Sequence, residues 1–385
     1  MEKVQFRIIT VLLLSITAFI TDPSYAAKNV VLMIGDGMGP ASVVVAKYYS
    51  ELILGRDLGM QVIMDMGNTG YMVNLSSSGL VTDSAASATA MATGVKTTNG
   101  ALGVDVDGIV LESVLERAQK LGKRVGLVTT DTIVGATPSG FGAHVVSRKM
   151  KDKIPEQFLA KKINVLFGGG AESFKAKEGG SDKIQDFINA GYIVARTKDE
   201  LNKINAGKVA LALGLFSEKE VDYYQTRAST VPSLVDMTIK ALEILSRDED
   251  GFFLMIEGAR IDHAAHINDA KRLVDELLEF DNTISVVEQY IKRNPDTLLI
   301  VTADHETGSP VFDYPYKYKK PEELEELKQL KNIHWIGKEH TSAPLMLFGI
   351  GPGAEQLRGM HDNTCVANII FQALSQAGGT KTGGK

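Results

Sequence analysis

The sequence is poor in cysteine: its 385 residues include only Cys365. One thiol cannot form an intramolecular disulfide, so stability must come from a packed core, bound metals or assembly. The sequence also lacks an excess of positive charge. Its 47 acidic residues outnumber its 41 lysines and arginines and give a formal net charge of −6. This balance argues against a nucleic-acid-binding surface and against general binding to anionic membranes. An anionic substrate would therefore need a local cationic site.

Apolar runs long enough to span a membrane are missing as well. The longest run, residues 8–20, follows MEKVQFR and precedes PSYA-AK, a small-x-small cleavage pattern that ends at Ala26. Such a run is short for a membrane span, and this order is typical of a secretory signal peptide. We expect residues 1–26 to be removed, leaving a periplasmic or secreted protein without a membrane anchor.

Short apolar runs that end in Gly, Asp or Glu recur along the chain, and hydrophobic residues make up 44% of it. The runs are VVLMIGDGMG (30–39), VGLVTTD (125–131), VLFGGG (165–170), FFLMIEG (252–258), TLLIVTADH (297–305) and LMLFGIGPG (345–353). They are typical of buried parallel strands. Between them lie helical stripes, such as Leu273, Leu277, Phe280, Ile284, Val287 and Ile291. We predict an α/β fold with a doubly wound, mostly parallel central sheet flanked by helices, and residues 27–385 are long enough for one large domain of this kind or two smaller ones.

One segment, about 307–339, departs from this alternation. It contains DYPYKYKK, the charged PEELEELKQLKN and HWIGKE, and is predicted to be a surface insertion. Its charges are expected to form a solvated face. Its aromatic residues can pack locally or line an interface; they are Tyr314, Tyr316, Tyr318 and Trp335.

The stretch VTDSAASATAMATG, residues 81–94, predicts a helix with few large side chains. Asp83 or Ser84 can cap its start, the alanines favour helix, and Gly94 can end it. The free N–H groups of such a start can hold an anion beside the Ser84 hydroxyl. Most Asp-Ser pairs before an alanine run are only caps, so this signal needs support from elsewhere in the chain.

Acidic and histidine residues follow several of the predicted strands, where ligands lie in doubly wound sheets. They are Asp36, Glu257, Asp262, His263, His266, Asp304, His305 and His340. Each has a plain alternative, such as a turn residue, a helix cap or a satisfied buried histidine. Together they have the composition of a metal centre, since carboxylate and imidazole groups suit zinc. Arg148 and Thr137 follow another run, and the Arg148 fork matches two phosphate oxygens.

With these residues the chain resembles the alkaline phosphatases. The motifs IGDGMG, TDSAASATA, ATPSGFGAHVVSR, EGARIDHAAH, VTADHETG and EHTSAP occur in the family's order over nearly the whole mature chain. The resemblance implies a homodimer with two zinc ions and one magnesium ion per chain. It assigns the first zinc to Asp262, His266 and His340, the second to Asp36, Asp304 and His305, and magnesium to Asp36, Thr137 and Glu257.

By the same resemblance Ser84 is the nucleophile and forms a phosphoserine, while Asp83, Arg148 and His263 contribute to substrate binding. The implied activity is hydrolysis of small-molecule phosphate monoesters. A related phosphodiesterase or sulfatase is the enzymatic alternative. A noncatalytic phosphate- or metal-binding protein of the cell envelope is the alternative from another class.

Two positions depart from, or vary within, the family pattern. Gly135 stands where relatives often carry an aspartate or histidine that supports the magnesium site, so we expect weaker magnesium binding, which Gly135→Asp should strengthen. His263 stands where relatives vary, and a solvent-facing role and a tuning role are both open. The remaining histidines are assigned to packing (His144), to the surface (His334) and to the surroundings of the site (His361).

Overall fold

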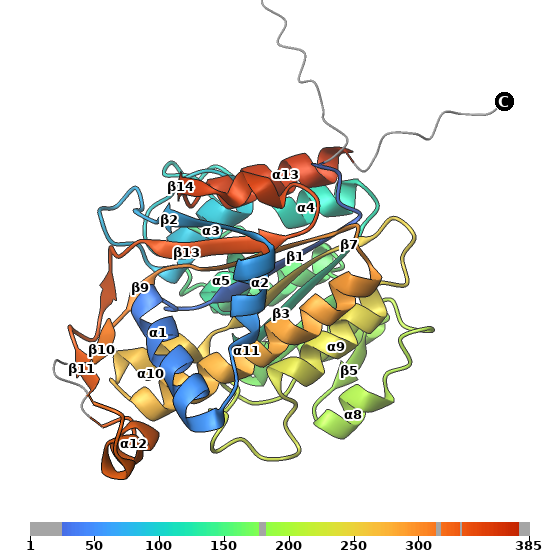
Figure 1. Ribbon diagram of the computed structural model, residues 1–385. Helices are drawn as coiled ribbons and strands as arrows, with labels where there is room; N and C mark the ends of the chain where they lie inside the picture. Colours follow the sequence, from blue (N-terminus) through green and yellow to red (C-terminus); the bar gives the residue numbers. More distant parts are fainter. Residues whose placement is uncertain (1–24, 177–181, 313–316, 332, 377–385) are drawn as a thin grey trace, which may run out of the picture.

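A ten-stranded sheet forms the middle of the computed structural model, which describes residues 25–176, 182–312, 317–331 and 333–376 (Figure 1). The spatial order of its strands is β14-β2-β13-β8-β1-β7-β3-β4-β6-β5. The bounds are β1 (Asn29–Gly35), β2 (Asn68–Val73), β3 (Arg124–Thr132), β4 (Val165–Gly169), β5 (Ile193–Ala195), β6 (Ala212–Leu215), β7 (Phe252–Gly258), β8 (Thr297–Ala303), β13 (Leu345–Ile350) and β14 (Gly359–Asp362).

The six predicted strands are all present, and five of them lie side by side and parallel. Strands β8, β1, β7, β3 and β4 pair parallel in that order, and their fully buried residues explain why the runs are continuously apolar. The sixth run was expected to be parallel, and that expectation is wrong. It forms β13, which is antiparallel to both β8 and β2.

The direction of β13 follows from the path of the chain before it. After β8 the chain builds the insertion beyond the carboxyl end of the strand. Strand β12 (His340–Thr341) then pairs with β9 (Glu306–Thr307) at that same edge. The chain therefore enters β13 from the carboxyl edge of β8 and must run back along it.

Helices cover both faces of the sheet, which confirms the doubly wound architecture (Figure 1). One face carries α2 (Gly59–Met66), α9 (Leu234–Leu245) and α11 (Ala270–Arg293), with α1 (Pro40–Tyr49) packed on α11. The other carries α3 (Ser84–Thr93), α4 (Val114–Lys120), α5 (Ala136–Gly142) and α13 (Cys365–Gln376). The remaining helices are α6 (Ile154–Ala160), α7 (Lys183–Asn189), α8 (Lys198–Lys203), α10 (Arg260–His266), α12 (Pro321–Lys328) and the short turns η2 (Ser50–Leu54), η3 (Lys151–Lys153), η4 (Ala171–Phe174) and η5 (Ala354–Leu357).

Helix α11 matches the predicted apolar stripe. All six stripe residues, from Leu273 to Ile291, are buried. The helix ends at the predicted stop, because Asn294 is its C-cap and Pro295 follows. The stripe is therefore a packing face.

Helix α3 needs its small side chains for packing. Its N-cap is Asp83, whose carboxylate accepts from Ala86 N at 3.0 Å, and all ten of its residues are buried. It packs closely on α5: a Cβ added to Gly140 would lie 2.7 Å from the Ala88 Cβ. A larger residue at either position would push the two helices apart, so the alanines fix the position of Ser84 against the sheet.

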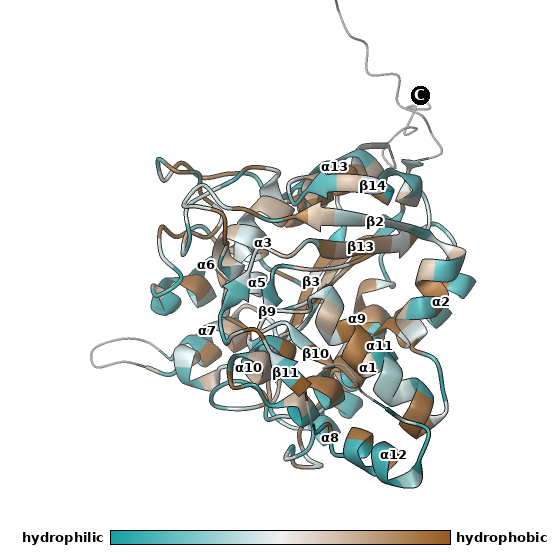
Figure 2. Cartoon of the chain, turned by 60° about the vertical axis from the view of Figure 1, so that its left-hand side comes forward, coloured by the Kyte–Doolittle hydropathy of each residue, from teal (hydrophilic) through white to brown (hydrophobic). Residues whose placement is uncertain are grey.

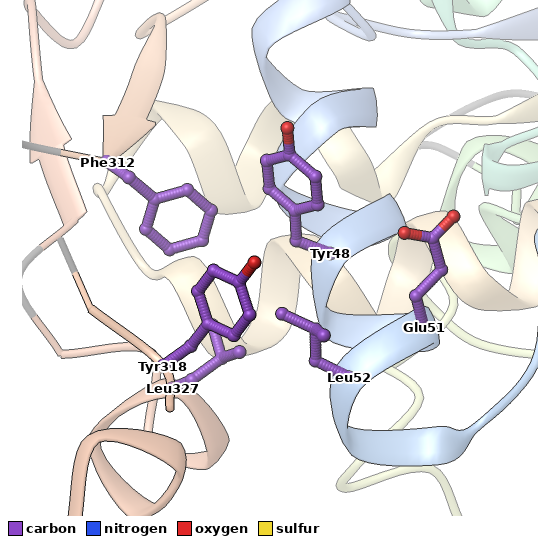
Figure 3. Close-up of a pocket in the computed structure, with 6 residues that line it drawn as sticks. All are labelled: Tyr48, Glu51, Leu52, Phe312, Tyr318 and Leu327. Carbon is purple, nitrogen blue, oxygen red and sulfur yellow. The ribbon is translucent and has the colours of Figure 1, made fainter. Parts of the chain in front are cut away.

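The insertion is largely hydrophilic, as predicted. It contains the hairpin of β10 (Pro310–Phe312) and β11 (Ile333–Trp335) and the helix α12, which is mostly teal in Figure 2 and buries only Leu327 among its residues. Tyr318 and Phe312 face Tyr48 across a hollow of about 290 Å³ between the insertion and α1 (Figure 3). Trp335 lies against Gly308. Trp335 thus packs locally, Tyr318 lines the hollow and remains 48% exposed, and Tyr314 and Tyr316 lie outside the described residues.

The predicted signal peptide also lies almost wholly outside the described residues, which begin at Tyr25. Within the part of the chain that the structure describes, no helix combines the length and the apolar character needed to cross a membrane.

Candidate active site and metal centre

The site residues meet at the carboxyl ends of four adjacent parallel strands, β8, β1, β7 and β3. The register pairs Gly35 of β1 with Gly258 of β7 and with Ala303 of β8. Asp36, Glu257 and Asp304 are therefore neighbours although they are far apart in sequence. The sheet rule used on the sequence points to this edge.

Side chains that follow β1 and β8 form one possible cation site. Asp36, Asp304 and His305 each offer a ligand atom, and these atoms lie within 4.8 Å of one another. His305 Nε2 is 3.4 Å from Asp36 Oδ1 and 3.2 Å from Asp304 Oδ2. The other Asp304 oxygen accepts from the backbone N–H groups of Gly37 and His305, at 3.1 and 2.9 Å. These bonds fix the carboxylate and leave Oδ2 directed at the site.

A second possible cation site adjoins the first. Asp262, His305 and His340 also offer ligand atoms within 4.8 Å of one another. His266 Nε2 lies 3.2 Å from Asp262 Oδ2 and 3.2 Å from His340 Nε2. Asp262 and His266 share a face of α10, as their spacing of four residues predicts, whereas His340 arrives on β12. The set assigned to the first zinc is thus brought together, with His305 beside it. We call these six residues the cation centre: Asp36, Asp262, His266, Asp304, His305 and His340.

Unpartnered atoms indicate that the cation centre fits divalent metal ions. Among the described residues, Asp36 Oδ1 and Asp304 Oδ2 are buried without a hydrogen-bond partner. The Nε2 atoms of His266 and His340 face each other, which places two ring nitrogens of the same kind in contact. Buried carboxylate oxygens like those of Asp36 and Asp304 reduce the stability of the fold unless a cation or a hydrogen-bond donor contacts them. Carboxylate and imidazole donors in this arrangement suit zinc.

The pKa shifts within the cation centre also indicate that it suits bound cations. Burial, followed by the charges of Asp304, Asp262 and Glu257, raises the pKa of Asp36 well above its usual range, while the charge of Arg148 acts in the opposite direction. Burial lowers the pKa of His305, which keeps its ring neutral and able to act as a ligand. A bound cation would favour the charged Asp36.

Asp262 and His266 form the charged pair of the cation centre. Burial alone would raise the pKa of Asp262, but the hydrogen bond from His266 holds it below its usual range. The same hydrogen bond raises the pKa of His266 to about 9. Metal binding at this pair would therefore release a proton from His266.

Ser84 lies at the edge of the cation centre. It is the first residue of α3, only 5% exposed, and its Oγ is 3.2 Å from His305 Nε2. The N–H groups of the first helical turn surround it. The hydroxyl thus lies between a helix start that favours anions and groups that can bind metals.

Arg148 approaches the same helix start from the loop after α5. Its Nη1 is 3.3 Å from Asp83 Oδ2, and its side chain is 40% exposed. Asp83 therefore has two tasks, because its other oxygen caps α3. The guanidinium is oriented but remains accessible to a ligand.

Thr137 and Glu257 lie together beside the cation centre. The Thr129 hydroxyl donates to Glu257, and Thr137 lies near enough to favour the charged carboxylate. Burial, followed by the charge of Asp131, nevertheless raises the pKa of Glu257 to about 8. Thr137 Oγ1 is buried and makes no hydrogen bond of normal geometry within the described chain. Together with Asp36 these oxygens fit a hard cation such as magnesium, and we call the set Asp36, Thr137 and Glu257 the third cation site.

His263 lies on the α10 turn beside the site and contacts Arg260. Arg260 Nη1 is 2.7 Å from His263 Nδ1, and its guanidinium stacks on Tyr223 at 3.8 Å from the ring centre. A guanidinium only donates hydrogen bonds, so Nδ1 must accept and the ring hydrogen lies on Nε2. His263 is therefore oriented by a neighbour and does not face solvent freely.

Sequence reasoning missed several residues that support the site. Thr307 donates to Asp262 Oδ1 at 2.6 Å and lies 3.2 Å from His305 Nδ1. Arg260 was not predicted to belong to the site. Thr129 and Asp131 were not predicted either, although both lie at the end of the run VGLVTTD, which forms one of the strands that end at this edge of the sheet. The rule for strand ends would have found Asp131. Nothing in the local pattern marks Thr307 or Arg260.

The remaining histidines lie on other contacts. His144 links Gly103 O and Glu116 Oε1, both at 2.8 Å, which agrees with a packing role. His334 is on strand β11 of the insertion and is exposed, as the surface assignment predicts. His361 hydrogen-bonds Arg358 O at 2.8 Å, three residues before it, so this contact does not support the expected place near the site.

Comparison with known proteins gives consistent matches. The family model "Alkaline phosphatase" matches residues 27–332. Alkaline phosphatase 4 of Bacillus subtilis is 34% identical over 90% of this chain and 88% of its own length. The crystal structure of Thermus thermophilus alkaline phosphatase has a TM-score of 0.85 and 28% identity, and the match covers 91% of this chain and 92% of that one. A TAB5 alkaline phosphatase variant solved with Mg bound has a TM-score of 0.79 and 26% identity, covering 91% and 99%.

Proposed function

Because the chain belongs to the alkaline phosphatase family and is a phosphatase, we propose that it hydrolyses phosphate monoesters through a phosphoserine on Ser84. One observation carries the proposal. Ser84 Oγ lies 3.2 Å from His305 Nε2, the same ring atom that faces Asp36 and Asp304. A nucleophile at a helix start beside buried, unpaired carboxylates is suited to a dianion accompanied by metal ions.

The proposed cofactors are two zinc ions and one magnesium ion. Asp262, His266 and His340 would hold the first zinc, and Asp36, Asp304 and His305 the second. Asp36, Thr137 and Glu257 would hold magnesium. When bound, such cations neutralise phosphate charge and lower the pKa of the oxygen groups that they contact. The orphaned oxygens of Asp36, Asp304 and Thr137 support this assignment.

Ser84 would attack phosphorus in line with the ester oxygen. Its hydroxyl loses a proton to water, a bond forms between Oγ and phosphorus, and the bond to the ester oxygen breaks. The leaving group takes a proton from water and departs as an alcohol. Water then attacks the phosphoserine, the Oγ–phosphorus bond breaks, and inorganic phosphate leaves with Ser84 restored. The N–H groups at the start of α3 hold the phosphoryl oxygens through both steps.

Arg148 and His263 would bind the substrate. The fork of Arg148 matches two unesterified phosphate oxygens, and the Asp83 carboxylate at 3.3 Å holds it above the start of α3. The Nε2–H of His263, oriented by Arg260, would reach the phosphate through water. A diester keeps two unesterified oxygens for Arg148 but leaves none over for the α3 N–H groups and carries one negative charge fewer, which favours monoesters over diesters.

Turnover with three substrates tests the proposal and its alternatives. The purified protein should hydrolyse an aryl phosphate monoester faster than the matching diester or aryl sulfate. Activity should disappear with excess chelator and return with zinc and magnesium. A preference for the diester or the sulfate would support the related enzymes instead, and no turnover with full metal content would support a noncatalytic binding protein.

We further propose one catalytic domain over residues 27–385, with an insertion at about 307–339, made as an exported precursor and assembled as a homodimer. The signal sequence pattern of residues 1–26 supports export to the periplasm or medium. N-terminal sequencing of the exported protein should find Ala27 first, and light scattering at micromolar concentration should give twice the mass of the mature chain.

A further inference from the structure

The space beside Gly135 is already filled by a carboxylate. Gly135 is the N-cap of α5 with φ −61° and ψ 172°, a conformation that any residue can adopt. A Cβ added there would lie 2.2 Å from Asp131 Oδ2 and 2.9 Å from Thr132 O. A side chain at position 135 would therefore displace the Asp131 carboxylate and press on the Thr132 carbonyl, although the backbone angles there do not require glycine.

Asp131 is linked to the third cation site through Thr129. In the register of β3 with β7, Thr129 is paired with Glu257. The Thr129 hydroxyl accepts from Asp131 N at 2.8 Å and donates to the Glu257 carboxylate. Asp131 follows two residues later on the same face of the strand. One hydroxyl group thus links the backbone of Asp131 to the Glu257 carboxylate.

The charges around Asp131 agree with this placement. Its charge is the largest cause, after burial, of the raised pKa of Glu257. Burial also raises the pKa of Asp131, while a charge on His263 acts in the opposite direction. Two carboxylates this close repel unless a cation lies between or beside them. The charge of Asp131 therefore acts on a ligand of the third cation site, and a charge on His263 acts on Asp131.

An independent observation points to a ligand at the same place. Thr137 is 1% exposed, and within the described residues its hydroxyl makes no hydrogen bond of normal geometry, although it lies near enough to Glu257 to favour the charged carboxylate. Helix α5 begins directly after Gly135, so the unpartnered hydroxyl and the Asp131 carboxylate flank the same helix start. Magnesium keeps several of its waters, and those waters need acceptors beyond the direct ligands.

We propose that Asp131 is a positioning residue for a magnesium ion held by Asp36, Thr137 and Glu257. The Asp131 carboxylate accepts hydrogen bonds from water bound to this ion. It occupies the space that a side chain at position 135 would otherwise take. This inference rests on the proposed function. It replaces the expectation that Gly135 leaves the ion without support. It also predicts that Gly135→Asp alone weakens the site, because its carboxylate would collide with that of Asp131.

Magnesium titration of the zinc-loaded protein by calorimetry tests the proposal without measuring turnover. Asp131→Asn should weaken magnesium binding by about 10- to 100-fold, as losses in the outer shell of a metal typically do. Gly135→Asp should also bind more weakly than the unchanged protein. The double variant Asp131→Ala/Gly135→Asp should recover at least tenfold over Asp131→Ala. Asp199→Asn, the same kind of change at an exposed residue of α8, should bind as the unchanged protein does.

The outcomes separate this inference from the proposed function. Thr137→Val removes a direct ligand and should abolish binding of the ion. If the unchanged protein takes up no magnesium, or Thr137→Val binds it equally well, the third cation site itself is wrong. If Thr137→Val loses the ion but Asp131→Asn binds as tightly as the unchanged protein, only the role of Asp131 is overturned.

Discussion

Acidic side chains gather in two buried regions of this protein, at the carboxyl ends of the central strands and around Arg227 beside α11. In the second region the Arg227 guanidinium donates to both oxygens of Glu279, and the Leu234 N–H donates to the same carboxylate at 2.9 Å. Glu276 lies nearby and accepts from the Tyr224 N–H at 2.6 Å. In the first region Asp36 and Asp304 keep buried oxygens without a partner among the described residues.

The two regions compensate their buried negative charge in different ways. The Arg227 side chain is 5% exposed and always charged, so the charge of Glu279 is balanced permanently within the chain and the ion pair serves structure. At Asp36 and Asp304 the described residues provide no lysine or arginine in contact, and the carboxylate oxygens without a hydrogen-bond partner suit ions that come from solution. Loss of a group in the first region should therefore affect turnover, and loss of a group in the second should affect stability.

The largest effect is expected from Ser84→Ala. Turnover of an aryl phosphate should fall by on the order of 10³-fold or more, with residual activity because groups that act together are not additive. Folding and metal content should not change, since the hydroxyl is neither in the core packing nor a required metal ligand. Acid quench and mass spectrometry should find phosphoserine in the unchanged protein only. A phosphoserine at full level in the variant would remove Ser84 from its role.

Arg227→Met tests whether the second acidic region, around Arg227, contributes to stability. Removing one partner of a buried ion pair typically costs about 3–5 kcal/mol, because the remaining charge is left unpaired. Denaturant unfolding of the metal-loaded variant should show this loss, while turnover per folded molecule should stay within about twofold. Adding Glu279→Gln to Arg227→Met should recover part of the stability. A stable Arg227→Met variant with lost turnover would reverse the comparison.

Glu276→Gln should change how stability depends on pH. Burial and the charge of Glu279 raise the pKa of Glu276 to about 7, above its ordinary value of 4.5. The folded state therefore holds a proton that the unfolded state releases, so this group lowers stability as pH rises from about 4.5 to about 7. The neutral glutamine removes that loss, and its oxygen can still accept from Tyr224. The variant should be more stable than the unchanged protein at pH 8, by up to about 3 kcal/mol, and equal to it near pH 4.

The smallest effects are expected at Asp83, whose ion pair with Arg148 is partly exposed. Asp83→Asn keeps a good N-cap but removes the charge that orients Arg148. Its stability should change little, because exposed ion pairs contribute about 0–1 kcal/mol, while KM should change by a few-fold. Asp83→Ala should in addition lose about 1 kcal/mol from the missing cap. Equal stabilities of the two variants would show that capping by Asp83 is not important.

Several features of this protein follow from short stretches of sequence. The apolar runs predict six of the ten strands of the central sheet, the stripe in residues 270–293 predicts α11, and Asp83 predicts the start of α3. The rule for strand ends brings Asp36, Glu257 and Asp304 to one edge of the sheet. These are properties of neighbouring residues and of parallel strands in general, so a sequence pattern is enough to predict them.

Other features depend on which segments the fold places together. An apolar run does not encode strand direction, and β13 runs antiparallel only because the insertion returns the chain to the edge it left. Glu257 is 128 residues from the Thr129 hydroxyl that binds it, and Arg227 is 52 residues from Glu279. The sequence alone leaves Gly135 without an explanation, because the carboxylate that fills its space belongs to the preceding strand end. Contact between such groups depends on strand register and helix packing, which are set by the burial of the whole core and not by the residues on either side.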